Sequence, residues 1–293
     1  MKLEETKLNC QLPSLDHVAE GTAEVPQVSL SRHAKLMVRR HLSPGRERSF
    51  KNHTNNWMNK LCHLTSKGTK PQAPLPNNGS SRLKEGDWVR VRSRKEIEST
   101  LNHWRQVRGC AFMPEMAAYC GTIHRVFKPM KKFVDERDLQ VKKSAGIILL
   151  EGVICNGTAE FGTCDRSCLH FWREEWLEKL DGEPTTTSPA DVPLQDPDLV
   201  RVSSLEKIEA TLDQDRRLRG CTFMPEMAEY CGTTHRVLKR MSRFVDERTL
   251  QVKRSSGIAL LEGVMCKGCA EFGTCDRSCP YLWREEWLES VNV

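Results

Sequence analysis

The chain has 293 residues, of which 38% are hydrophobic and 29% are charged, and it carries a net charge of +6. This composition favours several small domains over one large apolar core, and no stretch reaches the roughly 18 apolar residues of a membrane helix. Acidic residues stand at positions 4 and 5, where a signal peptide has basic ones, so we expect a cytoplasmic protein.

Residues 1–85 form a basic segment with little hydrophobic periodicity. Residues 1–86 hold 14 Lys/Arg against 7 Asp/Glu, whereas the rest of the chain has a net charge of −1. A polar stretch of this kind buries too little apolar surface to offset the entropy of ordering it, so we predict a largely disordered tail. Its basic residues are candidates for sequence-independent contacts with nucleic-acid phosphates. They are Arg39, Arg40, Arg46, Arg48 and Lys51.

Two copies of one sequence follow, at residues 86–180 (copy 1) and 197–293 (copy 2). Asp87 aligns with Asp198, and the alignment continues from there without a gap. About 70% of the aligned positions are identical. The stretch 181–196 between the copies is rich in Pro, Thr and Asp, which is typical of a linker. We therefore predict two tandem modules.

Within copy 1 the pattern predicts short strands and short helices. WVRVRS alternates with period two, Pro114 is a favoured first residue of a helix, and Trp172 and Trp176 have the spacing of an amphipathic helix. Predicted strands cover 88–93, 124–128, 139–143 and 146–153, and predicted helices cover 95–102, 114–119 and 171–180. The fold class is α+β, with each copy a short-stranded sheet or an SH3-like barrel with short helices.

Each copy holds five cysteines in register, and disulfides are not expected because the cytoplasm keeps thiols reduced. The five are Cys110, Cys120, Cys155, Cys164 and Cys168 in copy 1, and Cys221, Cys231, Cys266, Cys275 and Cys279 in copy 2. Buried free thiols, redox thiols and metal ligands remain as interpretations. The polar residues around the last three cysteines of each copy do not resemble a hydrophobic core, which favours metal ligands there.

The spacing C-x8-C-x3-C at Cys155, Cys164 and Cys168 suggests thiolates that meet at one metal ion, as zinc requires at about 2.3 Å. Cys266, Cys275 and Cys279 repeat the pattern. A fourth ligand must come from elsewhere. We expect Cys120 and Cys231, which precede a glycine, with His124, His235, Cys110 and Cys221 in reserve. The prediction is one zinc ion per copy, although four thiolates also suit an iron–sulfur cluster.

The string GDWVRVRS…FMPEM…YCGTxHRV…LEGVxC…WREEWL resembles a group of uncharacterised bacterial proteins that contain one such module. The resemblance covers residues 86–180 and 197–290 and leaves the basic tail uncovered. It implies a bacterial source and a real domain. It supplies no catalytic residue.

Three functions remain open at the level of sequence. The first is a non-enzymatic, zinc-stabilised interaction protein whose two copies bind a protein or a nucleic acid, with avidity from the tandem arrangement. The second is an iron–sulfur or metal-dependent redox or biosynthetic enzyme, with Cys110 and His124 as further participants. The third is a metal sensor or storage protein. Common nucleotide-binding and hydrolase motifs are absent from the sequence, and we favour the first function.

Overall fold

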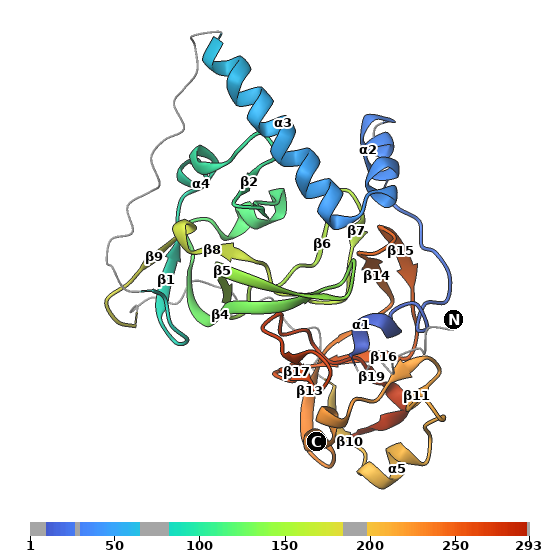
Figure 1. Cartoon of the computed structure of the whole chain (residues 1–293). Coiled ribbons are helices and arrows are strands. Elements are labelled where there is room, and N and C mark those ends of the chain that lie inside the picture. The colour runs from blue at the N-terminus through green and yellow to red at the C-terminus, as the bar shows by residue number, and fades with distance from the viewer. Residues whose placement is uncertain (1–9, 27–29, 65–81, 184–197, 292–293) are drawn as a thin grey trace.

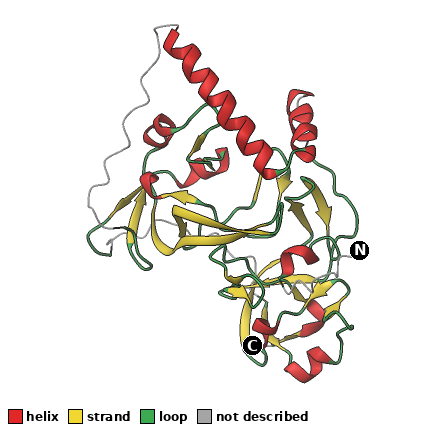
Figure 2. Ribbon diagram, viewed as in Figure 1, coloured by secondary structure: helices red, strands yellow, loops and turns green. Residues whose placement is uncertain are grey.

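The computed structural model describes residues 10–26, 30–64, 82–183 and 198–291 (Figure 1). The described residues form a mixed structure of short helices and small antiparallel sheets (Figure 2), which confirms the predicted mixture of helix and sheet. Almost all of the predicted linker lies outside the described residues, as do residues 1–9, 27–29 and 65–81 of the predicted tail. The prediction of disorder is not tested there.

Each copy contains one five-stranded antiparallel sheet with the same strand order. In copy 1 the order is β8-β5-β4-β1-β9 and in copy 2 it is β19-β16-β13-β10-β20. The copy 1 strands are β1 (Trp88–Val91), β4 (Ile123–Asp135), β5 (Gln140–Leu150), β8 (Trp172–Arg173) and β9 (Leu177–Lys179). Their counterparts are β10 (Leu199–Val202), β13 (Thr234–Arg240), β16 (Ile258–Leu261), β19 (Trp283–Arg284) and β20 (Leu288–Ser290).

Short hairpins and short helices complete both copies. The hairpin strands of copy 1 are β2 (Gln106–Val107), β3 (Cys110–Ala111), β6 (Gly157–Thr158) and β7 (Gly162–Thr163). Those of copy 2 are β11 (Arg217–Leu218), β12 (Cys221–Thr222), β14 (Arg243–Asp246), β15 (Gln251–Arg254), β17 (Gly268–Cys269) and β18 (Gly273–Thr274). The helices are α4 (Arg94–Thr100), η1 (Pro114–Tyr119) and η2 (Glu174–Trp176), then α5 (Leu205–Glu209), η3 (Pro225–Tyr230) and η4 (Glu285–Trp287).

Most of the predicted elements are present, with small changes at their ends. The strand at 88–93 is β1, the helix at 95–102 is α4, and the helix that starts at Pro114 is the 3-10 helix η1. The two strands predicted at 139–143 and 146–153 are one continuous strand, β5, which pairs with β4 along most of its length. The two residues between them, Ser144 and Ala145, are small and have no strong preference for a strand.

The helix predicted at 171–180 is wrong, because this stretch is β8, a 3-10 turn (η2) and β9. Trp172 lies in β8 and Trp176 ends the 3-10 turn, and both are fully buried against Phe112. Val91 of β1 pairs with Leu177 and so fixes β9 at the sheet edge. Two buried rings four residues apart fit a strand–turn–strand as well as a helix, so spacing alone could not distinguish them.

The segment 1–85 differs from the expected disordered tail. Its described part forms α1 (Gln11–Ser14), α2 (Leu30–His41) and α3 (Pro44–Leu64). Leu12, Leu15 and Val18 are buried in the hydrophobic core of copy 2. The amide of Gln11 donates to the Thr222 carbonyl at 2.7 Å and accepts from the backbone N–H of Leu282 at 2.8 Å. Burial of this short apolar run on a neighbouring surface offsets the entropy that ordering it costs.

The two copies contact each other reciprocally through equivalent aspartates. The Asp165 carboxylate of copy 1 accepts hydrogen bonds from the backbone N–H groups of Ser242 and Arg243 in copy 2, at 3.1 and 3.0 Å. The Asp276 carboxylate accepts from the backbone N–H groups of Lys131 and Lys132, at 2.9 and 3.1 Å. Each copy therefore uses the loop between its second and third clustered cysteines to hold the other copy. In Figure 1 this loop of copy 2, beside β17, lies against β4.

A cluster of two buried arginines, the buried Glu136 and the partly exposed Glu247 lies between these contacts. Glu136 is fully buried and forms ion pairs with Arg166 at 2.7 Å and with Arg277 at 3.3 Å. Arg277 also pairs with Glu247 at 3.0 Å, and the backbone N–H of Glu247 donates to Glu136 at 3.1 Å. Because charges buried without partners are costly, this cluster fixes the register in which the copies meet.

Among the described residues, no helix is both long enough and apolar enough to cross a lipid bilayer.

Replacement of Glu136 by alanine should strongly weaken the contact between the copies. It leaves two buried guanidinium groups without a shared carboxylate, and we expect the free energy of unfolding to fall by about 3–5 kcal/mol. Urea unfolding followed by tryptophan fluorescence measures the change. The control is Glu98→Ala, which removes exposed ion pairs with Arg94 and Arg105 and should have little effect. Similar losses in the two variants would contradict the role of the buried cluster.

Candidate functional site

The three clustered cysteines of each copy lie on adjacent backbone segments. In copy 1 the backbone N–H of Cys155 donates to the carbonyl of Cys168 at 2.7 Å, and that of Cys164 donates to Asn156 at 3.0 Å. The same two bonds recur in copy 2, from Cys266 to Cys279 at 2.8 Å and from Cys275 to Lys267 at 3.1 Å. The segment with the first cysteine thus runs between those with the second and third, which brings distant sequence positions together.

A glycine two residues after the first cysteine sets the shape of this loop. The backbone N–H of Gly157 lies 3.4 Å from the Cys155 sulfur, and Gly268 makes the same contact with Cys266. Gly157 has φ +115°, and a Cβ there would lie 2.0 Å from the carbonyl oxygen of Gly162. Only glycine fits such a close approach. An N–H aimed at sulfur also favours the thiolate, the form that binds metals.

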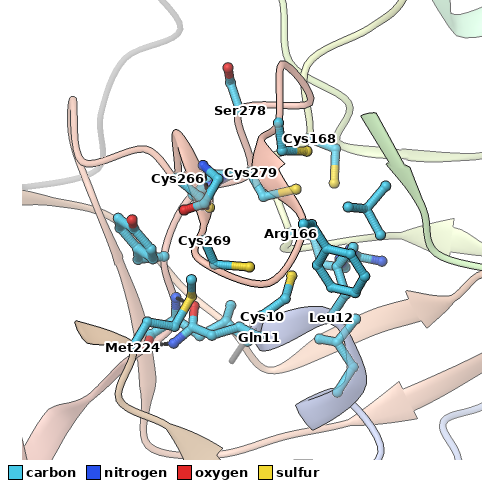
Figure 3. A pocket seen from close by; sticks show the side chains of 18 residues that line it. Cys10, Gln11, Leu12, Arg166, Cys168, Met224, Cys266, Cys269, Ser278 and Cys279 are labelled. Atoms are coloured by element: carbon cyan, nitrogen blue, oxygen red, sulfur yellow. Dashed lines mark hydrogen bonds between the residues drawn. The ribbon is translucent and has the colours of Figure 1, made fainter. Parts of the chain in front are cut away.

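A cavity of about 40 Å³ lies where copy 2, copy 1 and the N-terminal segment meet. Six cysteines line it, and Figure 3 shows five of them by label around the same space. The six are Cys10 from the N-terminal segment, Cys168 from copy 1, and Cys266, Cys269, Cys275 and Cys279 from copy 2. No imidazole or carboxylate side chain is among the described residues that line it.

Burial raises the pKa of several thiols around the cavity. It raises the pKa of Cys10 to about 12, and the neighbouring thiols Cys266, Cys269 and Cys275 add to the rise. Burial also raises the pKa of Cys266 to about 11, and the pKa values of Cys168 and Cys279 lie above the ordinary value for the same reason. Each thiolate that forms makes ionisation of the neighbouring thiols less favourable, because like charges repel. Several of these thiols would therefore ionise together only if a cation were bound.

The described part of the chain shows no group of three or more His, Cys, Asp or Glu side chains arranged to hold a metal ion. The predicted zinc and its ligands are therefore not shown, and they remain predictions. What the structure provides is the backbone arrangement of Cys155, Cys164 and Cys168 and of their counterparts. A cysteine side chain has three staggered χ1 positions, so sulfurs on neighbouring segments can approach one another by rotation.

The expected fourth ligands, Cys120 and Cys231, are not among the residues that line the cavity. Cys120 follows η1, and the charged groups that act on its thiol are Arg94 and Glu98 rather than cysteines. For Cys231 that group is Glu209.

The reserve ligands also have other partners. His124 pairs with Val89 in the middle of the sheet, and its Nε2 lies 2.7 Å from the Thr122 hydroxyl. His235 makes the equivalent contact with Thr233 at 2.7 Å. The thiols of Cys110 and Cys221 donate to the carbonyls at 171 and 282, each at 3.4 Å.

Three residues near the clustered cysteines were not predicted from the sequence: Cys10, Cys269 and His170. Cys10 stands alone in a polar stretch, and no local pattern connects it with copy 2. Cys269 lacks a counterpart, because Thr158 occupies that place in copy 1. Its spacing from Cys266 is C-x2-C, however, which is a usual zinc-ligand spacing, so this signal was available. His170 follows Cys168 by two residues and is buried.

Most of the predicted nucleic-acid contacts are occupied within the chain. Glu47 pairs with Arg39 at 3.2 Å and with Lys51 at 2.7 Å. Arg40 donates to the Leu250 carbonyl at 3.1 Å, which ties α2 to copy 2. Arg46 and Arg48 are exposed on α3.

Comparison with known proteins finds no matching family model and no matching curated protein. The resemblance to single-module bacterial proteins therefore stays a prediction.

The raised pKa values predict slow thiol chemistry in metal-free protein. At pH 8, a thiol of pKa about 11 is roughly two hundredfold less ionised than one of pKa about 8.5, so Cys155 and Cys266 should react correspondingly slowly with iodoacetamide. Because the thiolate reacts, the rate should rise about tenfold per pH unit up to about pH 11. Mass spectrometry of chelator-treated protein, with urea-unfolded protein as control, measures this. A rate that levels off below pH 9 would show that burial does not raise the pKa of these thiols.

Proposed function

We propose that the chain is a non-enzymatic interaction protein whose fold is stabilised by zinc bound to clustered cysteines. The observation that supports this most is the cavity lined by six cysteines from three separate parts of the chain. A disulfide network is a poor explanation, because all of the described cysteines are free. A purely hydrophobic explanation is less favoured, because the loops that carry these cysteines are polar, with Asp165, Arg166 and Ser167 between the second and third cysteines of copy 1.

In copy 1 the proposed ligands are Cys155, Cys164 and Cys168. In copy 2 they are Cys266, Cys275 and Cys279, with Cys10 and Cys269 as neighbouring thiols. Glu136 and Glu247 balance the charges of Arg166 and Arg277, so little positive charge remains for several thiolates. Zinc would supply that charge, and a closed set of four ligands makes a zinc site structural rather than catalytic.

The residues around the cavity favour this function over an enzyme. Without an imidazole or carboxylate among the described lining residues, the cavity lacks the usual general bases. Its volume of about 40 Å³ suits an ion and is far below the roughly 300 Å³ of the smallest typical ligand pockets. An iron–sulfur cluster remains the alternative that four thiolates allow, and reversible metal sensing or storage is the other.

We propose that each five-stranded sheet is an SH3-like barrel. The support is the strand order, in which the first strand lies between the second and the last. A 3-10 turn also joins the last two strands in each copy, as η2 in copy 1 and η4 in copy 2. The two copies would then be tandem modules that pack together through the Asp165 and Asp276 loops.

A partner would bind to the exposed side of α3. Phe50 and Thr54 hold this helix on copy 1, where they contact Trp104. Trp57 remains 57% exposed and Met58 38% exposed, on a helix that also carries exposed basic residues. An aromatic side chain among cations is a typical arrangement for single-stranded nucleic acid, in which bases stack on the ring and phosphates meet the cations.

Metal analysis of protein purified without oxygen tests the zinc proposal. We expect colourless protein with up to two zinc ions per chain, and a lower melting temperature after removal of zinc by a chelator. Cys279→Ser should lose about one of the two ions. Cys110→Ser is the matched control, because that thiol bonds to the Phe171 carbonyl and should not affect zinc content. Brown protein that contains iron and sulfide would indicate an iron–sulfur cluster instead of zinc. Metal-free protein of unchanged stability would refute both the zinc site and the iron–sulfur cluster.

Binding of a 20-nucleotide single-stranded DNA tests the α3 surface. Affinity should fall steeply between about 50 and 200 mM salt, because phosphate contacts release counterions. Trp57→Ala should cost about 1–3 kcal/mol in binding free energy through lost base stacking. Arg48→Glu should weaken binding more than Lys95→Glu, which makes the same charge change at an exposed position on α4. Fluorescence anisotropy gives the dissociation constants. Binding that does not depend on salt would contradict the proposal that the partner is a nucleic acid.

A further inference from the structure

His170 lies on the same side of the backbone as two of the clustered cysteines of copy 1. An isolated antiparallel bridge joins Ile154 and Leu169, so residue 155 is opposite 168 and residue 153 is opposite 170. Opposite residues, and residues two apart along an extended chain, share a face. The backbone bonds agree, since the N–H of His170 donates to the Val153 carbonyl at 3.1 Å. Cys155, Cys168 and His170 therefore project from one face.

The imidazole of His170 is buried without a full set of partners. The side chain is only 3% exposed, and its Nδ1 has no hydrogen-bond partner within the described structure. Nearby, the carboxylate of Glu115 accepts a hydrogen bond from the Ala159 N–H through Oε1, while its Oε2 is unpartnered among the described residues. A buried imidazole with an unused ring nitrogen can bind a metal ion through that nitrogen.

The second copy shows how far a side chain at this position reaches. Tyr281 is the counterpart of His170 in the gapless alignment of the two copies. The hydroxyl of Tyr281 interacts with the thiol of Cys266, which is the counterpart of Cys155. In copy 1, Glu115 acts electrostatically on both Cys155 and His170. Position 170 is thus next to the first clustered cysteine.

The copies also differ at a second position near the clustered cysteines, where copy 2 gains a cysteine. Copy 1 has His170 and Thr158, whereas copy 2 has Tyr281 and Cys269. Each copy therefore has one potential fourth ligand near its three clustered cysteines, at a different position in each. Cys269 is buried, lines the cavity and acts on the thiol of Cys266.

We propose that the two copies hold metal sites of different composition: Cys155, Cys164, Cys168 and His170 in copy 1, and Cys266, Cys269, Cys275 and Cys279 in copy 2. This assignment rests on the proposed function. It replaces Cys120 and Cys231 as fourth ligands. Three thiolates with one imidazole and four thiolates are both common zinc sets. Glu115 is the available acceptor for the second ring N–H of His170, as carboxylates often are for zinc-bound histidines.

A swap of ligands between the copies tests the proposal. His170→Tyr gives copy 1 the residue of copy 2 and should release one zinc ion per chain, or weaken its binding at least tenfold. The double variant His170→Tyr/Thr158→Cys makes copy 1 like copy 2 at both positions and should restore two zinc ions. His124→Gln is the matched control, because that histidine bonds to Thr122 and should leave zinc content unchanged.

X-ray absorption at the zinc edge of the unaltered protein gives a second readout that does not depend on the folding of any variant. The averaged shell should contain about 3.5 sulfur atoms at about 2.3 Å and about 0.5 nitrogen atoms at about 2.0–2.1 Å. Two zinc ions with only sulfur ligands, or a His170→Tyr protein that keeps both ions with an unchanged shell, would overturn the assignment and leave the proposed function intact. A protein without zinc would overturn both.

Discussion

The buried carboxylate of Glu136 is the group on which the arrangement of the two copies depends. It belongs to copy 1, yet it holds the guanidinium of Arg277 from copy 2 together with Arg166 from its own copy. Both arginines directly precede the Ser-Cys pair of their loops, so their positions fix those of Cys168 and Cys279. This ion cluster therefore keeps Cys168 and Cys279 partly buried where the two copies meet. Asp165 and Asp276 then fix the same loops from the outside.

This mode of packing explains why cysteines gather from distant parts of the chain. A single copy would leave its third clustered cysteine at the surface, where a thiol is exposed to oxidation. When the copies pack together, each loop covers the other, and the segment from Cys10 to Val18 covers the remaining side of copy 2. The core of copy 2 therefore contains Leu12, Leu15 and Val18, whereas the described core of copy 1 contains only Leu83 from residues 1–85. Two sequences that are about 70% identical thus have different environments, which is the condition under which their ligand sets could diverge.

Local patterns predicted the local structure well. Period-two alternation located β1 and the proline at 114 located η1. The two aligned copies have sheets with the same strand order. The helix predicted at 171–180 failed because burial of Trp172 and Trp176 arises from contacts with Phe112, which lies far earlier in the sequence. Such contacts leave no local trace in the sequence.

The candidate site was predictable only in part. The C-x8-C-x3-C spacing grouped three cysteines, and the structure places them on adjacent backbone segments. It gave no information on the fourth partner, because Cys10 reaches copy 2 from the other end of the chain and His170 becomes significant only through its burial and register. Positions at which the copies differ were more informative about the fourth ligand than positions at which they are identical. Thr158 and His170 in copy 1 align with Cys269 and Tyr281 in copy 2.

Anomalous diffraction at the zinc absorption edge, from crystals of the protein grown without chelator, tests the central claim most directly. The account predicts two peaks per chain, one beside Cys155 and Cys168 and one at the cavity beside Cys266 and Cys279. Peaks elsewhere on the molecule, or a map without peaks in which these thiols stay apart, would contradict it.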